Sequence, residues 1–390
     1  IALQLGGRFD NIQPTSPFGS KMDMVVTPRA NLSVELFDNF NLRAGYGVAA
    51  KAPTLLYLYP TAGYYDLLNF NYYPTNPAER LVLITTKKFD LRNRDLKIMT
   101  NTKKEIGFDW TLDNKRLTVT GFHEKTKNGY DFSTILNSVT MVPLPKFQVL
   151  NYNPGMPPTL DPVPASIDTF VADYLMPNNN RVNVNKGVEF DLDLGRFDAI
   201  RTSFVFTGAW INSKSVNNDY YVVKRQVAGK DPTRVAIYEK GRGDVNERIT
   251  STLRMIHNIP ELRFIVTFSA QTIWDQSNVK VGHDSIPVGY IRRDNSQIVW
   301  LNDAQKQNIT SSDQELFTTI SPQTYIKESW PPLWLFYIRL TKEISKNIGF
   351  SFYANNVFSH RPLVESTRYK NQFERRNPSL FFGTEINIKL

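Results

Sequence analysis

Hydrophobic and polar residues alternate with a period of two along much of this chain. The last segment, Ser379 to Leu390, places apolar residues at almost every second position, with Gly, Glu, Asn and Lys between them. Such alternation is typical of a β-strand with one apolar and one polar face. The apolar face meets a protein core in a soluble protein, or lipid in an outer-membrane barrel.

The same pattern predicts about twelve strands of roughly ten residues. The predicted strands are Ile1–Asp10, Pro28–Phe37, Phe40–Val48, Lys104–Leu112, Arg116–Glu124, Val184–Leu194, Ile200–Ile211, Arg248–His257, Leu262–Trp274, Trp334–Glu343, Ile348–Phe358 and Leu380–Leu390.

The connections between these strands alternate between very short and long. The long ones are Asn11–Thr27, Ala49–Lys103, Lys125–Asn183, Asn212–Glu247, Asp275–Leu333 and Ser359–Ser379. This alternation predicts an all-β fold, an up-and-down antiparallel transmembrane barrel with short periplasmic turns and long external loops. We expect those loops to be without regular structure, which would be unusual in a compact soluble domain.

Charged residues indicate which face of each strand meets the lumen. In Val184–Leu194 the acids Glu189, Asp191 and Asp193 alternate with apolar residues. A charge facing lipid at the bilayer midplane costs up to about 2–4 kcal/mol for a basic residue and less for an acid, so these acids, and likewise Glu105, are expected to face the lumen. The final strand could pair with the first and thereby remove both free edges.

Composition narrows the possible functions. The chain has 390 residues, a net charge of +9 and no cysteine, and its basic residues are scattered, which argues against nucleic-acid binding. No apolar run reaches the roughly 18 residues of a membrane helix. The histidines His123, His257, His283 and His360 are not at metal-ligand spacing, and no nucleophile elbow or P-loop occurs. We therefore expect no metal site, no cofactor and no enzymatic activity.

Several motifs carry a family resemblance. The stretch Asn41–Pro60, "NLRAGYGVAAKAPTLLYLYP", resembles the middle of a TonB-dependent outer-membrane receptor barrel. Thr102–Leu112 and Asn185–Leu194 are similar to the signature strands that follow, and the C-terminal segments resemble receptors of the Bacteroidetes. The motifs are individually loose, but their order spans essentially the whole chain.

The resemblance implies a Gram-negative outer-membrane receptor that imports a scarce nutrient. Such receptors have an N-terminal plug inside a barrel of about 22 strands, and the TonB–ExbB–ExbD complex pulls on the plug. Residues 1–390 resemble only the C-terminal part of the barrel, so we expect the plug and the first strands to be absent from this chain. The implied partners are the plug, that complex and outer-membrane lipid, with a surface lipoprotein as a further candidate.

Two sets of candidate site residues follow. The resemblance implies that the lumenal acids Glu105 and Glu189 pair with plug arginines and lock the plug. In the tyrosine-rich segment, aromatic rings with polar tips suit a sugar, haem or a planar siderophore, although loop packing is the favoured interpretation. These ligand candidates are Tyr59, Tyr64, Tyr65, Tyr72 and Tyr73.

Two other interpretations remain open from the sequence. A complete twelve-stranded barrel would act as a passive porin or an outer-membrane hydrolase, with charged lumenal residues filtering solutes. A secreted soluble β-protein would have to bury the apolar faces in a core or an oligomer interface, because exposed patches of that size are rare. The ligand of a receptor stays open among siderophores, haem, cobalamin, oligosaccharides and peptides.

Overall fold

A computed structural model describes residues 1–12 and 24–389. Its main feature is a 13-stranded sheet, in which twelve strands follow one another in chain order and β20 lies off this path beside β17. Every pair is antiparallel, as between β6 and β7 and between β12 and β13. The twelve strands are β1 Ala2–Asp10, β2 Val25–Phe37, β3 Phe40–Lys51, β6 Met99–Leu112, β7 Lys115–Ser133, β12 Met176–Phe197, β13 Thr202–Asn217, β16 Arg242–Ile259, β17 Phe264–Val281, β21 Leu333–Glu343, β22 Ile348–Asn355 and β25 Phe381–Ile388.

All twelve predicted strands are confirmed, but several are longer than predicted. β12 has 22 residues and β7 has 19, and both extend beyond the prediction mainly on the side of the long loops. On that side the outward residues become polar, as in Lys125 and Lys127 of β7. The ladder of hydrogen bonds therefore continues where the alternation of apolar and polar residues stops.

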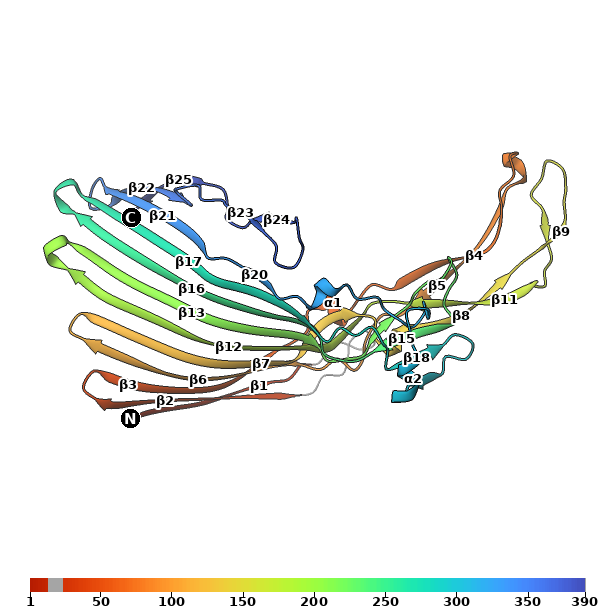
Figure 1. Ribbon diagram of the computed structural model, residues 1–390, viewed down its shortest axis with the longest axis horizontal. Coiled ribbons are helices and arrows are strands. Elements are labelled where there is room, and N and C mark those ends of the chain that lie inside the picture. The colour runs from red at the N-terminus through yellow and green to blue at the C-terminus, as the bar shows by residue number, and fades with distance from the viewer. Residues whose placement is uncertain (13–23, 390) are drawn as a thin grey trace.

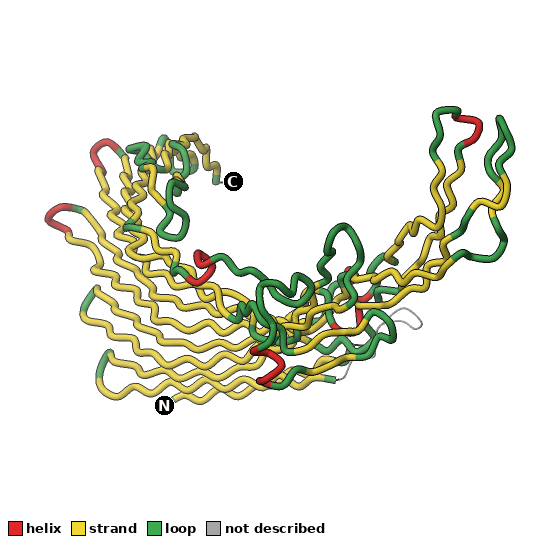
Figure 2. The backbone as a smooth tube through the Cα atoms, turned by 45° about the vertical axis from the view of Figure 1, so that its right-hand side comes forward, coloured by secondary structure: helices red, strands yellow, loops and turns green. Residues whose placement is uncertain are grey.

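The sheet curves strongly but stays open (Figures 1 and 2). Within the described residues, β1 pairs only with β2 and β25 pairs only with β22. The prediction that the last strand closes against the first of this chain is therefore wrong. Twelve strands curl only part of the way around, and the two edge strands remain unpaired on their outer sides.

Register places the predicted lipid-facing residues on one face. Leu42 pairs with Phe108, and Ile106 with Gly121, which in turn pairs with Val188. Exposed apolar side chains cover this face, including Val188 with 43% of its surface exposed. Lumenal and lipid-facing residues thus alternate as predicted.

The long connections are not structureless, contrary to expectation. They contain β4 Gly63–Tyr72, β5 Leu81–Phe89, β8 Val139–Lys146, β9 Val149–Asn151, β10 Thr159–Leu160, β11 Ser166–Asp173, β14 Tyr221–Val223, β15 Arg234–Tyr238, β18 Gly289–Arg292, β19 Ile298–Trp300, β20 Glu328–Trp330, β23 Leu363–Glu365 and β24 Phe373–Arg375. Helical turns are α1 Leu55–Leu58, η1 Pro77–Glu79, η2 Leu136–Ser138, η3 Asp198–Ile200, η4 Pro260–Leu262, α2 Asp303–Gln307 and η5 Pro322–Tyr325.

We call the packed part of these loops, residues 63–91, 136–174, 220–238 and 286–317, the cap. The cap holds much of the buried hydrophobic core of the molecule. Leu67 and Phe89 of the β4–β5 hairpin pack on Val142 and Leu144 of β8. Val171 of β11 packs on Val235 and Ile237 of β15, so segments far apart in the sequence form one body beyond the sheet.

Candidate functional site

The lumenal face of the sheet is polar and carries both predicted plug-locking acids. Glu105 on β6 pairs in register with Phe122 of β7, and Glu189 on β12 pairs with Thr120 of β7. The two acids therefore lie on neighbouring rows of the same face, separated by one strand. A hollow of about 360 Å³ surrounds Glu189. It is lined in part by Asp191 and by the threonines Thr118, Thr120, Thr207 and Thr252.

The two acids differ in their electrostatic state. The Glu105 carboxylate forms an ion pair with Lys103, with 2.5 Å between Nζ and Oε1. Glu189 is exposed, and its carboxylate has no ion pair or hydrogen bond among the described residues. Glu189 can accept a cation directly, whereas Glu105 would first have to exchange Lys103 for another partner.

An aromatic ring separates the two acids. Gly187 of β12 faces Phe122 across the ladder, and a Cβ built on Gly187 would lie 2.9 Å from the Phe122 ring. The ring therefore lies against the backbone of β12, in the place that a side chain at position 187 would occupy. The hydrogen-bond ladder sets the spacing of β6, β7 and β12, and the Phe122 ring covers the lumenal surface at Gly187.

Other charges on the lumenal wall neutralise one another. Arg43 forms an ion pair with Asp109 at 2.5 Å, and Asp109 also accepts a hydrogen bond from Thr118 at 2.7 Å. Near the other edge of the sheet, Arg339 pairs with Glu385 at 2.9 Å. Glu189 has no such bonded partner within the described residues, and the same is true of Asp191, two residues further along β12 on the same face.

The five candidate tyrosines are spread over loop 49–103 and do not form one site. Tyr59 packs near its base, against the cluster of Leu58, Leu96 and Ile98. Tyr65 points into the cap, where its hydroxyl donates to the carbonyl of Asp173 at 2.5 Å. Burial is the main cause that raises the pKa of Tyr65.

The remaining three tyrosines lie on the outside or at the tip of the β4–β5 hairpin. Tyr64 is 63% exposed and Tyr73 is 69% exposed. The Tyr72 ring contacts Tyr152 at 5.6 Å, and the Arg80 guanidinium lies 3.8 Å from the centre of the Tyr73 ring. Tyr59, Tyr65 and Tyr72 thus have packing partners in the loops, and Tyr73 is held by Arg80 although most of its side chain is exposed. Tyr64 is also mostly exposed.

The cap contains a buried charged group that sequence patterns do not reveal. Lys224 and Asp231 pair at 3.0 Å, with side chains only 11% and 12% exposed. Asp231 also accepts the backbone N–H of Val171 at 2.8 Å, and Lys224 donates to the Val171 carbonyl at 2.6 Å. Burial, opposed by Lys224, raises the pKa of the neighbouring Asp173 carboxyl. Only the fold brings these loops together, so no spacing in the sequence signals the contact.

Metal-binding clusters and membrane-spanning helices are both absent from the described residues. Within residues 1–12 and 24–389, no group of three His, Cys, Asp or Glu side chains is arranged to hold a metal ion. In the same ranges, none of the helices has the length and apolar character needed to cross a membrane.

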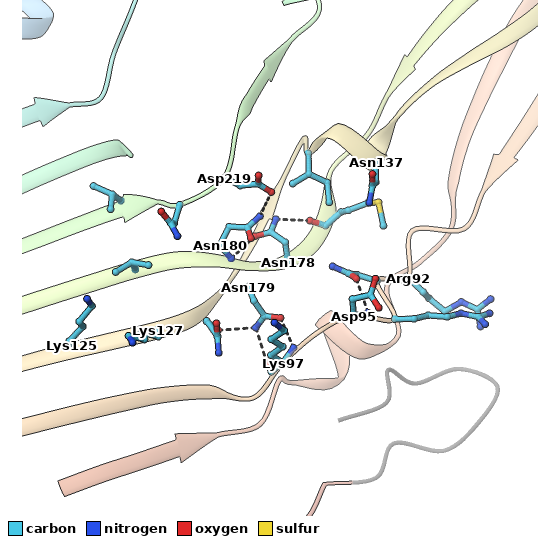
Figure 3. Close-up of a pocket in the computed structure, with 18 residues that line it drawn as sticks. Arg92, Asp95, Lys97, Lys125, Lys127, Asn137, Asn178, Asn179, Asn180 and Asp219 are labelled. Atoms are coloured by element: carbon cyan, nitrogen blue, oxygen red, sulfur yellow. Dashed lines mark hydrogen bonds between the residues drawn. The ribbon is translucent and has the colours of Figure 1, made fainter. Parts of the chain in front are cut away.

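A separate pocket of about 890 Å³ lies where the strands pass into the loops (Figure 3). Its lining includes Lys97, Lys125 and Lys127, together with Asn179 and Asn180. The Asn179 amide donates to the carbonyls of Lys97 and Asn128, both at 2.8 Å, which ties loop 49–103 to β7 and β12.

Comparison with known proteins gives a family and several similar folds. Residues 1–357 match the family described as TonB dependent receptor-like, beta-barrel. No curated protein matches the chain. The chain is similar to the siderophore receptor PirA from Acinetobacter baumannii, with 16% identity and a TM-score of 0.48, covering 94% of this chain and 41% of that one.

It is also similar to a mutant of the ferric enterobactin receptor PfeA from Pseudomonas aeruginosa, in complex with enterobactin. Here the identity is 16%, the TM-score is 0.50, and the coverage is 94% of this chain and 40% of that one. At this identity the likeness concerns the fold alone. The chain therefore spans well under half the length of these receptors.

Proposed function

The chain belongs to the family of TonB-dependent receptor β-barrels, and from this premise we propose that it is the C-terminal part of a receptor that imports a scarce nutrient. It is a protein of the Gram-negative outer membrane. The cap captures the nutrient from outside. TonB, driven by the proton-motive force through ExbB and ExbD, pulls on a plug and opens a path along the lumenal wall.

The proposal rests on the distribution of paired and unpaired charges on the lumenal wall. Two ion pairs, Arg43–Asp109 and Arg339–Glu385, compensate their own charges, whereas Glu189, like its neighbour Asp191, faces the lumen without a bonded partner among the described residues. A guanidinium on a plug surface is the complement of such a carboxylate, because the two form a charge-assisted and geometrically specific pair. A pair of this kind holds a plug firmly yet separates when one partner is displaced.

The open sheet supports the larger barrel over the self-contained porin. β1 and β25 each leave one edge unpaired within the described residues. Free strand edges exposed to lipid leave backbone N–H and C=O groups unsatisfied, and they do not occur within the hydrocarbon region. Additional strands between β1 and β25 would satisfy these groups and leave a lumen wide enough for a plug.

Nutrient uptake in cells tests the energy coupling. The full-length receptor is expressed in an outer membrane, and accumulation of labelled ferric siderophores, haem, cobalamin, oligosaccharides and peptides is compared with and without functional TonB. We expect one class to accumulate only when TonB and the proton-motive force are both present. Equal accumulation without TonB would refute the proposal and favour a passive pore.

Conductance in planar bilayers tests the role of the lumenal acids. We expect Glu189→Gln to raise the frequency of large open events, because the plug loses an anchoring charge. Glu105→Gln should have a smaller effect, since Lys103 already neutralises Glu105. Asp191→Asn, on the same strand and face, is the matched control, and an equal effect of all three changes would contradict a specific role for Glu189.

A further inference from the structure

The β4–β5 hairpin of the cap has one covered edge and one open edge. β4 pairs antiparallel with β5, and the two strands form a sheet of their own. Segment 145–147 covers the other edge of β4, because Phe147 donates its N–H to the Asn69 carbonyl at 3.4 Å and the Asn69 side chain donates to the Pro145 carbonyl at 2.9 Å. The outer edge of β5 has no such neighbour among the described residues.

The outer edge of β5 therefore carries backbone groups without a protein partner. Across residues 1–12 and 24–389, the N–H and C=O groups of Leu81–Phe89 bond only across the ladder to β4. In an antiparallel pair, alternate residues point these groups away from the partner strand. β5 thus offers a regular row of donors and acceptors along about 30 Å of extended backbone.

The sequence of β5 favours the addition of a further strand. Residues 81–86, LVLITT, are aliphatic or β-branched and include no charge, proline or glycine. Proteins commonly protect a free edge with charged residues or proline, and here lysines occur only at Lys87 and Lys88, next to the body of the cap. Val82 and Ile84 are 47% and 51% exposed on the same face of the strand. An open edge of this composition is a template for pairing with another chain.

The hairpin is placed where a nutrient arrives. It stands clear of the barrel strands and rises on the side toward which the sheet curls, above the lumenal face (Figures 1 and 2). Its tip is steadied by the neighbouring loop, where Tyr152 contacts the Tyr72 ring at 5.6 Å and the Gly155 N–H donates to Glu79 at 3.0 Å. Neither contact involves β5, so the edge stays accessible from outside.

The charges at the cap end of β5 are complementary to an acidic group. Lys87 and Lys88 are exposed and have no ion pair within the described residues, and the Lys88 ammonium lies 6.0 Å from the centre of the Tyr64 ring. Asp66, an acid of the same hairpin, accepts a hydrogen bond from Thr86 at 2.6 Å. Two ammonium groups beside one carboxylate leave this end of the edge positive.

We propose, building on the function proposed above, that β5 binds an extended peptide as an additional strand and that the imported nutrient is a peptide. Main-chain hydrogen bonds supply the affinity, Val82 and Ile84 contact alternate side chains, and an acidic residue of the peptide lies near Lys87 and Lys88. The occupant is a polypeptide because only an extended backbone repeats its donors and acceptors at the spacing of a strand, about 7 Å on one side. Sugars, haem and metal chelates have no such repeat.

Fluorescence anisotropy with the purified full-length receptor in detergent tests this proposal. The parent probe is the labelled octapeptide Glu-Thr-Val-Thr-Val-Thr-Val-Thr, capped at both ends. Two further probes carry backbone N-methyl groups, one at its odd positions and the other at its even positions. All three probes have the same side chains, and each methylated probe lacks the N–H donors of one edge.

We expect the parent probe to bind and the two methylated probes to differ in affinity by at least about tenfold, because only one of them loses the donors that face β5. The test variant Val82→Ser/Ile84→Ser should weaken binding of the parent probe by about tenfold through lost apolar contact. The matched control is Leu150→Ser/Val163→Ser, which removes two aliphatic side chains that are 64% and 68% exposed elsewhere on the cap. The control should bind as the wild type does, and heat-modifiable migration in gels checks that both variants are folded.

Three results would overturn the inference. They are the absence of binding by the parent probe, equal affinity of the two methylated probes, and an equal effect of the test and control variants. A receptor dimer that forms without peptide binding and is lost in Val82→Ser/Ile84→Ser would overturn it as well, and would assign the edge to a second copy of the chain.

This assay needs neither TonB nor a membrane potential, so it separates the inference from the proposed function. TonB-dependent uptake of another nutrient class, with no binding of the parent probe, would refute the peptide alone. Binding of the parent probe together with uptake that is independent of TonB would refute the receptor function and support the strand-addition site.

Discussion

The buried ion pair between Lys224 and Asp231 is a contact on which the cap should depend strongly. The two side chains lie 3.0 Å apart, Lys224 donates to the Val171 carbonyl, and Asp231 accepts the Val171 N–H, so together they join loop 212–247 to β11. Val171 itself is fully buried. Loss of this contact should therefore loosen two loops at once and leave the barrel strands in place.

The change Asp231→Asn keeps the shape of the side chain and removes its charge. Lys224 then remains almost buried with its main counter-ion gone, and breaking a buried pair in this way costs about 3–5 kcal/mol. Asp173 also interacts electrostatically with Lys224, which compensates part of the loss. A cost near the lower end, about 3 kcal/mol, corresponds to a factor on the order of 100 in the opening equilibrium of the cap.

Hydrogen exchange followed by mass spectrometry measures this equilibrium. Amides of β8, β11 and β15 should exchange on the order of 100-fold faster in Asp231→Asn, while amides of β12 and β13 should not change. Asp294→Asn is the matched control, because Asp294 pairs with Arg292 in the same cap but both side chains are exposed. Exposed pairs contribute little to stability, so its exchange rates should match the wild type.

A second variant separates charge from packing. Lys224→Met/Asp231→Leu replaces the pair with apolar side chains, which is often neutral when a buried ion pair is removed as a whole. We expect it to recover only part of the protection of the cap, because the N–H and carbonyl of the buried Val171 also lose their hydrogen bonds to these two side chains. If Asp231→Asn changes exchange in the cap by less than about threefold, or changes the barrel strands equally, the assignment of this pair as a cap anchor is wrong.

Two further predictions concern the barrel wall and the pH response of the cap. Gly187→Ala places a Cβ against the backbone carbonyl of Trp210 on β13 and should lower the free energy of unfolding by about 1–3 kcal/mol, seen as a lower urea midpoint. Gly349→Ala, with open space around the new Cβ, should leave the midpoint unchanged. Burial acts to raise the pKa of Glu315, but hydrogen bonds from Thr233 and Arg234 outweigh it and hold that pKa below its ordinary value. The ionised carboxylate of Glu315 thus stabilises the cap fully above the ordinary pKa, and this contribution is lost as the pH falls through the lowered value. The pH at which pepsin begins to cleave the cap should differ between the wild type and Glu315→Gln. The same onset pH in both proteins would contradict this prediction.

The barrel was largely predictable because lipid imposes a simple rule on it. A side chain on the outward face must be apolar within the bilayer, so the acids of β12 could be assigned to the lumen from sequence alone. Their register with β7 and β13 agrees with that assignment. The rule no longer applies where strands leave the bilayer, which is why the outer ends of β7 and β12 escaped prediction.

The candidate site was predictable only in part. Alternation placed Glu105 and Glu189 on one face, but it could not show that Lys103 neutralises the first and leaves the second unpaired. That distinction depends on which rotamers meet across neighbouring rows. The pair Lys224–Asp231 was missed for a different reason. Its partner Val171 lies 53 and 60 residues away in sequence, and such contacts depend on loop packing.

Aliphatic side chains are exposed on the outside of the barrel but buried inside the cap, and this difference has a functional consequence. In the barrel Val188 is 43% exposed toward lipid, whereas in the cap Val235 and Ile237 are fully buried among other loops. The cap therefore has its own hydrophobic core and its own buried ion pair, and the barrel is held by its ladder and by the membrane. A change inside the cap should alter ligand capture while leaving barrel assembly intact. A change on the wall, such as Gly187→Ala, should act on assembly first. Loops with an independent core can vary in sequence to suit a ligand, because their folding energy does not depend on the bilayer that fixes the strands beneath them.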